Sequence, residues 1–217
     1  MHDISHYKHI ILDCDGVILN SNKLKTLAFR KTLSSYDKNL VDSFINYHTK
    51  NGGISRYVKF NYFLKNILKK KEYQDEYLLL IKRFKKLLLN DLIKSKVDSY
   101  LIDFFKKNKS KSFYVLSGGD EEELKYVFKK KKLIKYFHGI YGSPKDKETI
   151  IKKFFLDKIS INKSLFIGDS ELDYIVSKKF GIDFIFKYQW TEFHQWRKFV
   201  KLNKINSIKN FKDFINN

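Results

Sequence analysis

The sequence has little cysteine, no long apolar run and no recognisable export signal. A single cysteine, Cys14, allows neither an internal disulfide nor a cysteine zinc site, which is typical of a cytoplasmic protein. No apolar stretch approaches the ~18 residues that a membrane span needs. The first apolar run is interrupted by Asp13 and Asp15 and lacks a small-residue cleavage site. We therefore expect a soluble, cytoplasmic chain with no signal peptide and no membrane partner.

Acidic residues are also scarce relative to basic ones. Asp and Glu number 24 against 44 Lys and Arg, which gives a formal net charge of +20. Such a charge ordinarily suggests nucleic acid as a partner. However, most of the basic residues are lysine, and abundant Ile, Asn, Phe and Tyr with one proline form a bias that an AT-rich coding sequence imposes on any function. We interpret runs such as residues 129–132 as solvated helix surface, with a polyanion-binding patch as the alternative. Nucleic acid is therefore not the expected partner, although the positive field would attract phosphorylated substrates.

A buried strand that ends in two carboxylates organises the chain. The apolar residues 10–12 predict the strand, and Asp13, Asp15 and Gly16 follow it directly. Period-2 alternation points both carboxylates to the same side of the chain. Two like charges at this place are costly unless a cation lies between them or one of them holds a proton. The stretch predicts a magnesium site, and an acidic turn after a strand is the alternative.

The next segment has a helical pattern. Apolar residues recur at helical spacing from about residue 23 to 90, and no strand-like alternation persists. We predict an α-helical domain over residues 21–94, inserted into an α/β core formed by residues 1–20 and 95–217. A break at Gly53 followed by Arg56 predicts either a helix stop or a loop in which both residues bind the substrate.

Polar residues also follow two later buried strands. One strand ends in Ser117 and Gly118, which offer a hydroxyl and backbone N–H groups to an anion, although a helix cap has similar chemistry. Another ends in Asp169, with Asp173 four residues later. Because strands alternate with helices, we predict a three-layer α/β fold with a parallel, Rossmann-like sheet, whose strand ends meet at one edge. The carboxylates gathered there make an oxygen-rich environment that suits Mg²⁺.

A lysine is expected beside these groups. Pro144 sets a turn before a helix, and Lys145 and Lys147 both lie close to it. Lys147 lies at the predicted helix start, where the macrodipole favours acids rather than bases, so its position hints at a functional use. We prefer Lys147 as the site lysine and keep Lys145 as the alternative.

These motifs resemble those of the haloacid dehalogenase superfamily, in the branch of phosphoglycolate phosphatases and β-phosphoglucomutases that carries a helical C1-type cap after the first strand. Four motifs occur in the family's order: residues 13–17, Ser117, a lysine within residues 143–147, and residues 168–173. The resemblance implies that Asp13 is the nucleophile and that Asp15 is the general acid and base. It also implies Ser117 and Gly118 as phosphate ligands, and Mg²⁺ held by Asp13, the backbone carbonyl of Asp15, Asp169 and Asp173.

The resemblance implies a Mg²⁺-dependent phosphatase that hydrolyses a small phosphorylated metabolite, such as a sugar phosphate or a phosphoglycolate-like ester, through an aspartyl-phosphate. Asp15 argues against a dehalogenase, because dehalogenases of the family lack the second aspartate. A sugar phosphomutase shares every core motif and is the main alternative, whereas a phosphonate hydrolase would need a reactive cap lysine. From a different class, the basic chain could be a non-catalytic binder of anions or nucleic acid. A monomer or a dimer is expected.

Overall fold

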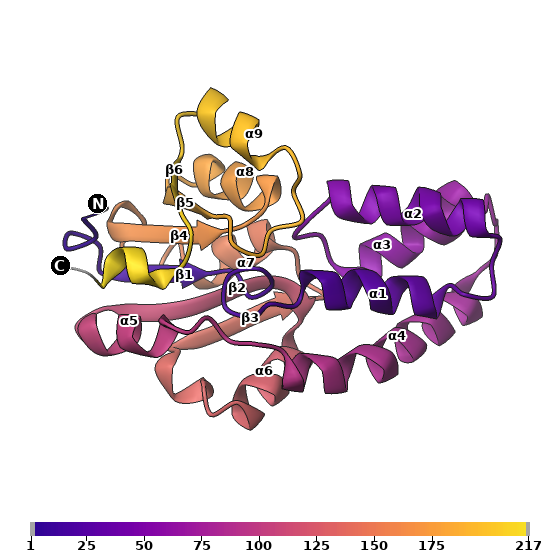
Figure 1. Cartoon of the computed structure of the whole chain (residues 1–217), viewed down its shortest axis with the longest axis horizontal. Helices are drawn as coiled ribbons and strands as arrows, with labels where there is room; N and C mark the ends of the chain where they lie inside the picture. The colour runs from indigo at the N-terminus through magenta and orange to yellow at the C-terminus, as the bar shows by residue number, and fades with distance from the viewer. Residues whose placement is uncertain (1–2, 216–217) are drawn as a thin grey trace.

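Parallel strands form one sheet at the centre of the computed structural model, which describes residues 3–215 (Figure 1). The order across the sheet is β3-β2-β1-β4-β5-β6. β1 lies between β2 and β4 because its apolar residues are fully buried and can face both helical layers. The strands are β1 His9–Leu12, β2 Ser112–Asp120, β3 Gly139–Ser143, β4 Ser164–Gly168, β5 Asp183–Lys187 and β6 Asn206–Ile208.

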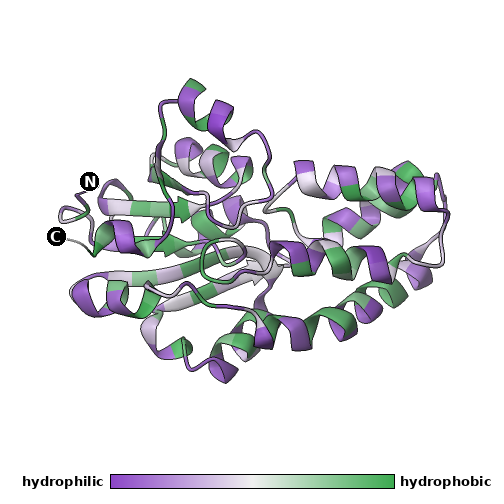
Figure 2. Cartoon of the chain, viewed as in Figure 1, coloured by the Kyte–Doolittle hydropathy of each residue, from purple (hydrophilic) through white to green (hydrophobic). Residues whose placement is uncertain are grey.

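Helices cover both faces of the sheet and complete the predicted three layers. Ile11 of β1 packs in one apolar cluster with α7 (Lys147–Phe154) and α8 (Glu171–Lys179). Ile10 and Leu12, which flank Ile11 in β1, point to the opposite face and pack with α5 (Leu101–Lys107) and α6 (Glu121–Lys130). Figure 2 shows apolar residues gathered along the strands and polar residues on the outer helix surfaces. The predicted α/β fold with a parallel sheet is confirmed.

Four further helices lie together beside the sheet and form what we call the cap (Figure 1). They are α1 Asn22–Thr32, α2 Lys38–Lys50, α3 Arg56–Tyr62, which continues into a π-helical turn, and α4 Gln74–Lys94. Aromatic rings join them: the centroid of Phe29 lies 5.3 Å from Phe44, 5.2 Å from Phe60 and 4.3 Å from Phe84. Each ring comes from a different helix, so aromatic packing joins the four helices of the cap.

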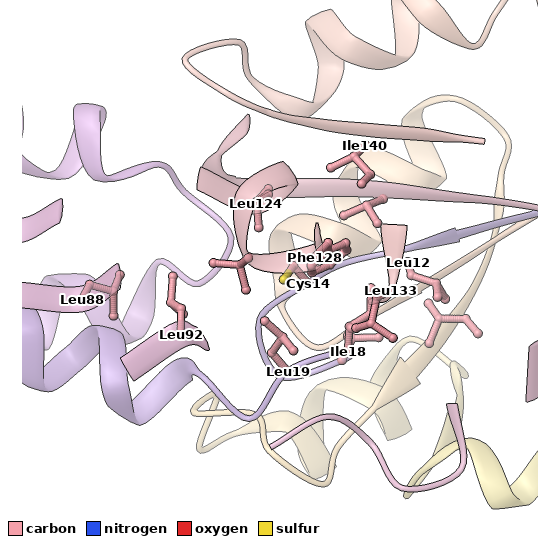
Figure 3. Close-up of a cluster of buried hydrophobic side chains, with 14 of the residues drawn as sticks. Leu12, Cys14, Ile18, Leu19, Leu88, Leu92, Leu124, Phe128, Leu133 and Ile140 are labelled. Carbon is pink, nitrogen blue, oxygen red and sulfur yellow. The ribbon is translucent and has the colours of Figure 1, made fainter. Parts of the chain in front are cut away.

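The chain enters and leaves the cap at one place. The Asn20 amide donates to the Lys96 carbonyl at 2.9 Å, and Leu19 forms a β-bridge with Val97. Apolar packing continues across this place, where Leu88 and Leu92 of α4 approach the loop after β1 (Figure 3). The division into a core of residues 1–20 and 95–217 and a cap of residues 21–94 stays a prediction.

Trp196–Leu202 forms α9 near the C-terminus. Over residues 3–215, none of the helices combines the length and the apolar character that crossing a bilayer requires.

Candidate active site

Asp13 and Asp15 lie where β1 ends, because the register of the sheet stops there. Leu12 is the last paired residue of β1, and the Asp13 amide still donates to the Ile167 carbonyl of β4 at 3.0 Å. The chain then turns sharply at Gly16, whose φ is +77°. A Cβ at Gly16 would lie 2.0 Å from Asp169 Oδ2. Glycine is therefore required both for the turn and for the close approach of a second carboxylate.

Three buried carboxylates meet at this edge of the sheet. Asp13, Asp169 and Asp173 each offer one oxygen, and these oxygens lie within 4.8 Å of one another. Asp169 follows β4, whereas Asp173 sits in the first turn of α8 and closes a capping box with Ser170. Ser170 Oγ donates to Asp173 Oδ2 at 2.7 Å. The capping box fixes the Asp173 carboxylate in place, so the cluster is built by local helix geometry as well as by the sheet.

Lys147 completes the cluster. Its ammonium donates to Asp13 Oδ1 at 3.0 Å and also to Asp173 Oδ1, and its side chain is only 3% exposed. Asp146 caps the helix that carries Lys147 by accepting from the Thr149 amide at 2.7 Å. Burial alone would lower the pKa of Lys147, but the two carboxylates raise it above its ordinary value, so the lysine is charged. Lys145, in contrast, is exposed.

The electrostatics of the cluster favour a bound cation. Burial raises the pKa of Asp13 to about 7, although Lys147 opposes the rise, and the neighbouring Asp173 and Asp15 add to it. Burial, together with Asp13 and Asp173, raises the pKa of Asp169 well above its ordinary value. The single positive charge of Lys147 therefore does not balance the negative charge of the three carboxylates. A hard divalent cation with oxygen ligands, such as Mg²⁺, fits this donor set in charge and in chemistry.

Asp15 stands apart from the cluster and is held by the cap. Its Oδ2 pairs with Lys25 of α1, and its Oδ1 accepts from Ser21 Oγ at 2.6 Å. Burial would raise the pKa of Asp15, but Lys25 and the hydrogen bond from Ser21 lower it overall. The neighbouring Asn22 donates to Asp169 Oδ2 at 2.7 Å. The first turn of the cap therefore contacts both carboxylate groups.

The end of β2 brings a hydroxyl and a glycine to the same edge. Ser117 is buried, and its Oγ accepts from the Gly119 amide at 3.0 Å. Gly118 lines a cavity of about 200 Å³ between core and cap, together with Asp13, Asp15 and Asp169. A Cβ on Gly118 would lie 2.1 Å from the Gly53 carbonyl oxygen. The cap loop at Gly53 thus rests directly on the core.

The family is decided by a match over most of the chain. A model of the haloacid dehalogenase-like hydrolase family matches residues 7–181. The protein belongs to this family. The family inferred from the motifs is thus confirmed, and the hydrolase carries the predicted carboxylates and lysine at one edge of its sheet.

Solved structures agree on the fold of this hydrolase. It is similar to a predicted phosphatase from Clostridium acetobutylicum, with 18% identity, 96% of both chains covered and a TM-score of 0.73. It is similar to β-phosphoglucomutase from Clostridium difficile, with 14% identity, 95% of this chain and 92% of that chain covered and a TM-score of 0.71. A third is the HAD-hydrolase YfnB from Bacillus subtilis bound to magnesium, with 15% identity, 96% of both chains covered and a TM-score of 0.65. No curated protein matches the chain.

Arg56 also reaches the cavity of the hydrolase, but its charge is already paired. Its guanidinium donates to both oxygens of Glu123 on α6, at 3.1 and 2.5 Å, and stacks 4.7 Å from the centroid of Phe84. The next residue, Tyr57, donates to Asp120 Oδ2 at 2.6 Å. These contacts make the first turn of α3 a buried link between cap and core, and substrate binding by Arg56 or Gly53 stays a prediction.

Several residues that line the cavity or contact its lining were not singled out from the sequence. Lys25 and Ser21 are four residues apart, which places both on one helical face behind Asp15, and this spacing was the available signal. Lysine is so frequent in the hydrolase that Lys25 and Lys59 do not stand out. Glu123 and Glu192 reach the site only through contacts between segments that are distant in the sequence.

Proposed function

We propose that this hydrolase is a Mg²⁺-dependent phosphatase that acts on a small phosphorylated metabolite. One observation carries the proposal: three buried carboxylates and a charged lysine form one cluster, and two of these carboxylates, Asp13 and Asp169, line a cavity together with Asp15. Such a site suits a transferring phosphoryl group, because the group is anionic and gains most from fixed positive charge. The family membership supports hydrolysis as the reaction class.

Asp13 is the proposed nucleophile. Lys147 holds Asp13 Oδ1 and fixes the orientation of the carboxylate. Attack of the Asp13 carboxylate on phosphorus forms an aspartyl-phosphate while the ester P–O bond breaks. When bound, Mg²⁺ would be held by Asp13, Asp169, Asp173 and the Asp15 backbone carbonyl and would neutralise charge on the phosphoryl group.

Asp15 is the proposed general acid and base. Its protonated carboxyl gives a proton to the leaving alcohol oxygen, and its carboxylate then takes a proton from the water that attacks phosphorus and frees Asp13. Lys25 lowers the pKa of Asp15 and holds it ionised, which is the form that activates water. We expect ester binding to loosen the Lys25 contact, so that Asp15 can carry the proton that the first step requires.

Hydrolysis of p-nitrophenyl phosphate tests the proposal. We expect turnover with Mg²⁺, none after chelation, and a loss of at least about 1,000-fold in kcat for Asp13→Asn. Asp157→Asn, a matched change at an exposed aspartate, should leave kcat unchanged. Equal rates in the Asp13→Asn variant and the wild type would contradict the assignment of the nucleophile.

The products and the DNA affinity separate the alternatives. Inorganic phosphate released from a sugar phosphate indicates a phosphatase, whereas an isomeric sugar phosphate without phosphate release indicates a phosphomutase. Tight, steeply salt-dependent retention of DNA without turnover would favour a nucleic-acid binder.

A further inference from the structure

The first turn of α1 directs its polar side chains to the core rather than to its own helix. Ser21 is the N-cap residue of α1, yet its hydroxyl donates to Asp15 Oδ1 at 2.6 Å and makes no capping hydrogen bond. A serine at this position ordinarily accepts from an amide of the first turn. Lys25 pairs with Asp15 from the following turn. The start of the helix is therefore arranged for contacts with the site instead of for its own capping.

Asn22, the first residue of α1, contacts a carboxylate of the buried cluster. Its Nδ2 donates to Asp169 Oδ2 at 2.7 Å and to the Trp190 backbone carbonyl at 3.0 Å. Both partners can only accept hydrogen bonds, so the NH₂ end of the amide must face them, and both of its donors are used. A carboxylate offers about four lone-pair positions, so this bond leaves Asp169 able to hold a cation.

The segment of residues 190–192, which follows β5, also joins α1 to Asp169. Its middle residue, Thr191, donates from Oγ1 to the Asp169 carbonyl at 2.6 Å. Its last residue, Glu192, accepts at Oε2 from Thr26 Oγ1 of α1 at 2.7 Å. One helix of the cap therefore contacts both ends of the segment, and the segment contacts Asp169 between them.

The bond between Asn22 and Asp169 joins the two parts of the fold. Asn22 opens the first helix of the cap, whereas Asp169 comes directly after β4. The bond can exist only while α1 lies against the end of β4. Hydrogen bonds to a ligating carboxylate fix its orientation, and loss of such a bond typically costs about 10–100-fold in metal affinity. The position of α1 is therefore able to affect how well Asp169 is arranged for a metal.

We propose that Asn22 is a positioning residue for the metal site: it fixes the Asp169 carboxylate, so that Mg²⁺ binds more tightly when α1 lies against the core. Because coupling between two equilibria is reciprocal, bound Mg²⁺ in turn holds α1 in this place. The proposal rests on the proposed function, since it takes Asp169 as a ligand of Mg²⁺. It adds that the cap contributes to metal affinity through an amide that acts on a ligand.

Mg²⁺ binding to the protein without substrate tests the proposal. In calorimetry, Asn22→Ala should weaken Mg²⁺ binding at least about 10-fold, because the Asp169 carboxylate loses the donor that orients it. Asn46→Ala, at an exposed asparagine of α2 outside the cavity, is the matched control and should leave the Mg²⁺ affinity unchanged. Thermal unfolding without Mg²⁺ establishes that each variant is folded.

Hydrogen exchange tests the reciprocal effect. At saturating Mg²⁺, amide exchange in α1 and in residues 190–192 of the wild type should slow by up to the same factor of about 10. The Asn22→Ala variant should show no such slowing. Equal slowing in the two proteins would overturn the coupling that we propose.

The remaining outcomes separate this proposal from the phosphatase. Equal Mg²⁺ affinities in the wild type and Asn22→Ala, with only a lower Tm for the variant, would give Asn22 a structural role and overturn the proposal. That result would leave the loss of turnover in Asp13→Asn, and with it the phosphatase, standing. Mg²⁺ affinity that depends on Asn22 in a protein that hydrolyses no phosphomonoester would overturn the phosphatase alone.

Discussion

The ion pair between Arg56 and Glu123 should contribute far more to stability than an exposed pair of the same chemistry. The two side chains are 4% and 2% exposed, and they join α3 of the cap to α6 of the core. Removing one partner of a buried pair costs about 3–5 kcal/mol, because the other charge stays buried without compensation. Glu123→Gln keeps the shape of the side chain and removes only its charge. We therefore expect its free energy of unfolding to fall by about 3–5 kcal/mol, and its Tm to fall by at least about 6 °C.

Arg30 and Asp42 provide a matched control. They form an arginine–carboxylate pair at 2.5 Å with side chains 47% and 42% exposed. Exposed pairs contribute about 0–1 kcal/mol, so Asp42→Asn should change the free energy of unfolding by no more than that. Urea unfolding at pH 7, followed by circular dichroism, measures the free energy of unfolding of Glu123→Gln and of Asp42→Asn. The double variant Arg56→Met with Glu123→Leu should regain most of the loss, since no buried charge remains. Equal costs for Glu123→Gln and Asp42→Asn would refute the reasoning.

Three more predictions concern the site. Lys147→Met should lower kcat/KM at least about 100-fold, because it removes the fixed charge beside Asp13, the proposed nucleophile. Lys145→Met should leave kcat/KM within about twofold, since Lys145 is exposed. Similar losses for the two variants in p-nitrophenyl phosphate hydrolysis would contradict the assignment of Lys147. Gly118→Ala places a Cβ 2.1 Å from the cap loop and should lower kcat about 100-fold, while Gly119→Ala, whose Cβ would meet its first neighbours at 3.3 Å, should have a smaller effect on the same assay. The raised pKa of Asp169 means that the folded protein binds this proton more tightly than the unfolded chain, so ionisation lowers stability as pH rises above about 4. Without metal, Asp169→Asn should therefore raise the Tm by more at pH 7 than at pH 5, and an equal gain at both pH values in thermal unfolding would oppose this.

Much of the fold followed from local patterns in the sequence. The apolar runs that became β1, β2 and β4 each end in polar residues, and a parallel sheet brings such ends to one edge. The sequence did not predict β6, because Asn206–Ile208 is three residues long and has no apolar alternation. Such a short edge strand forms only because β5 offers a partner.

The carboxylate cluster at the strand ends was easier to predict than the contacts that the cap residues make around it. Asp13 and Asp169 follow strands, so topology alone places them together. Arg56 was a candidate for substrate binding, but its pairing with Glu123 depends on how the cap sits on the core, 67 residues away in sequence. Lys25 was missed for the same reason: helical spacing shows which face a lysine occupies, not which carboxylate that face meets.

The chain enters the cap at Asn20 and leaves it at Lys96, and these two residues lie side by side. This arrangement has an evolutionary consequence. The residues between them form one contiguous stretch of chain, and the two ends of this stretch are joined by a hydrogen bond. Exchange of this single gene segment would replace the residues that the cap contributes to the cavity, while Asp13, the proposed nucleophile, and Lys147 stay where the sheet puts them. Diversification of substrate choice then needs no redesign of the reaction centre.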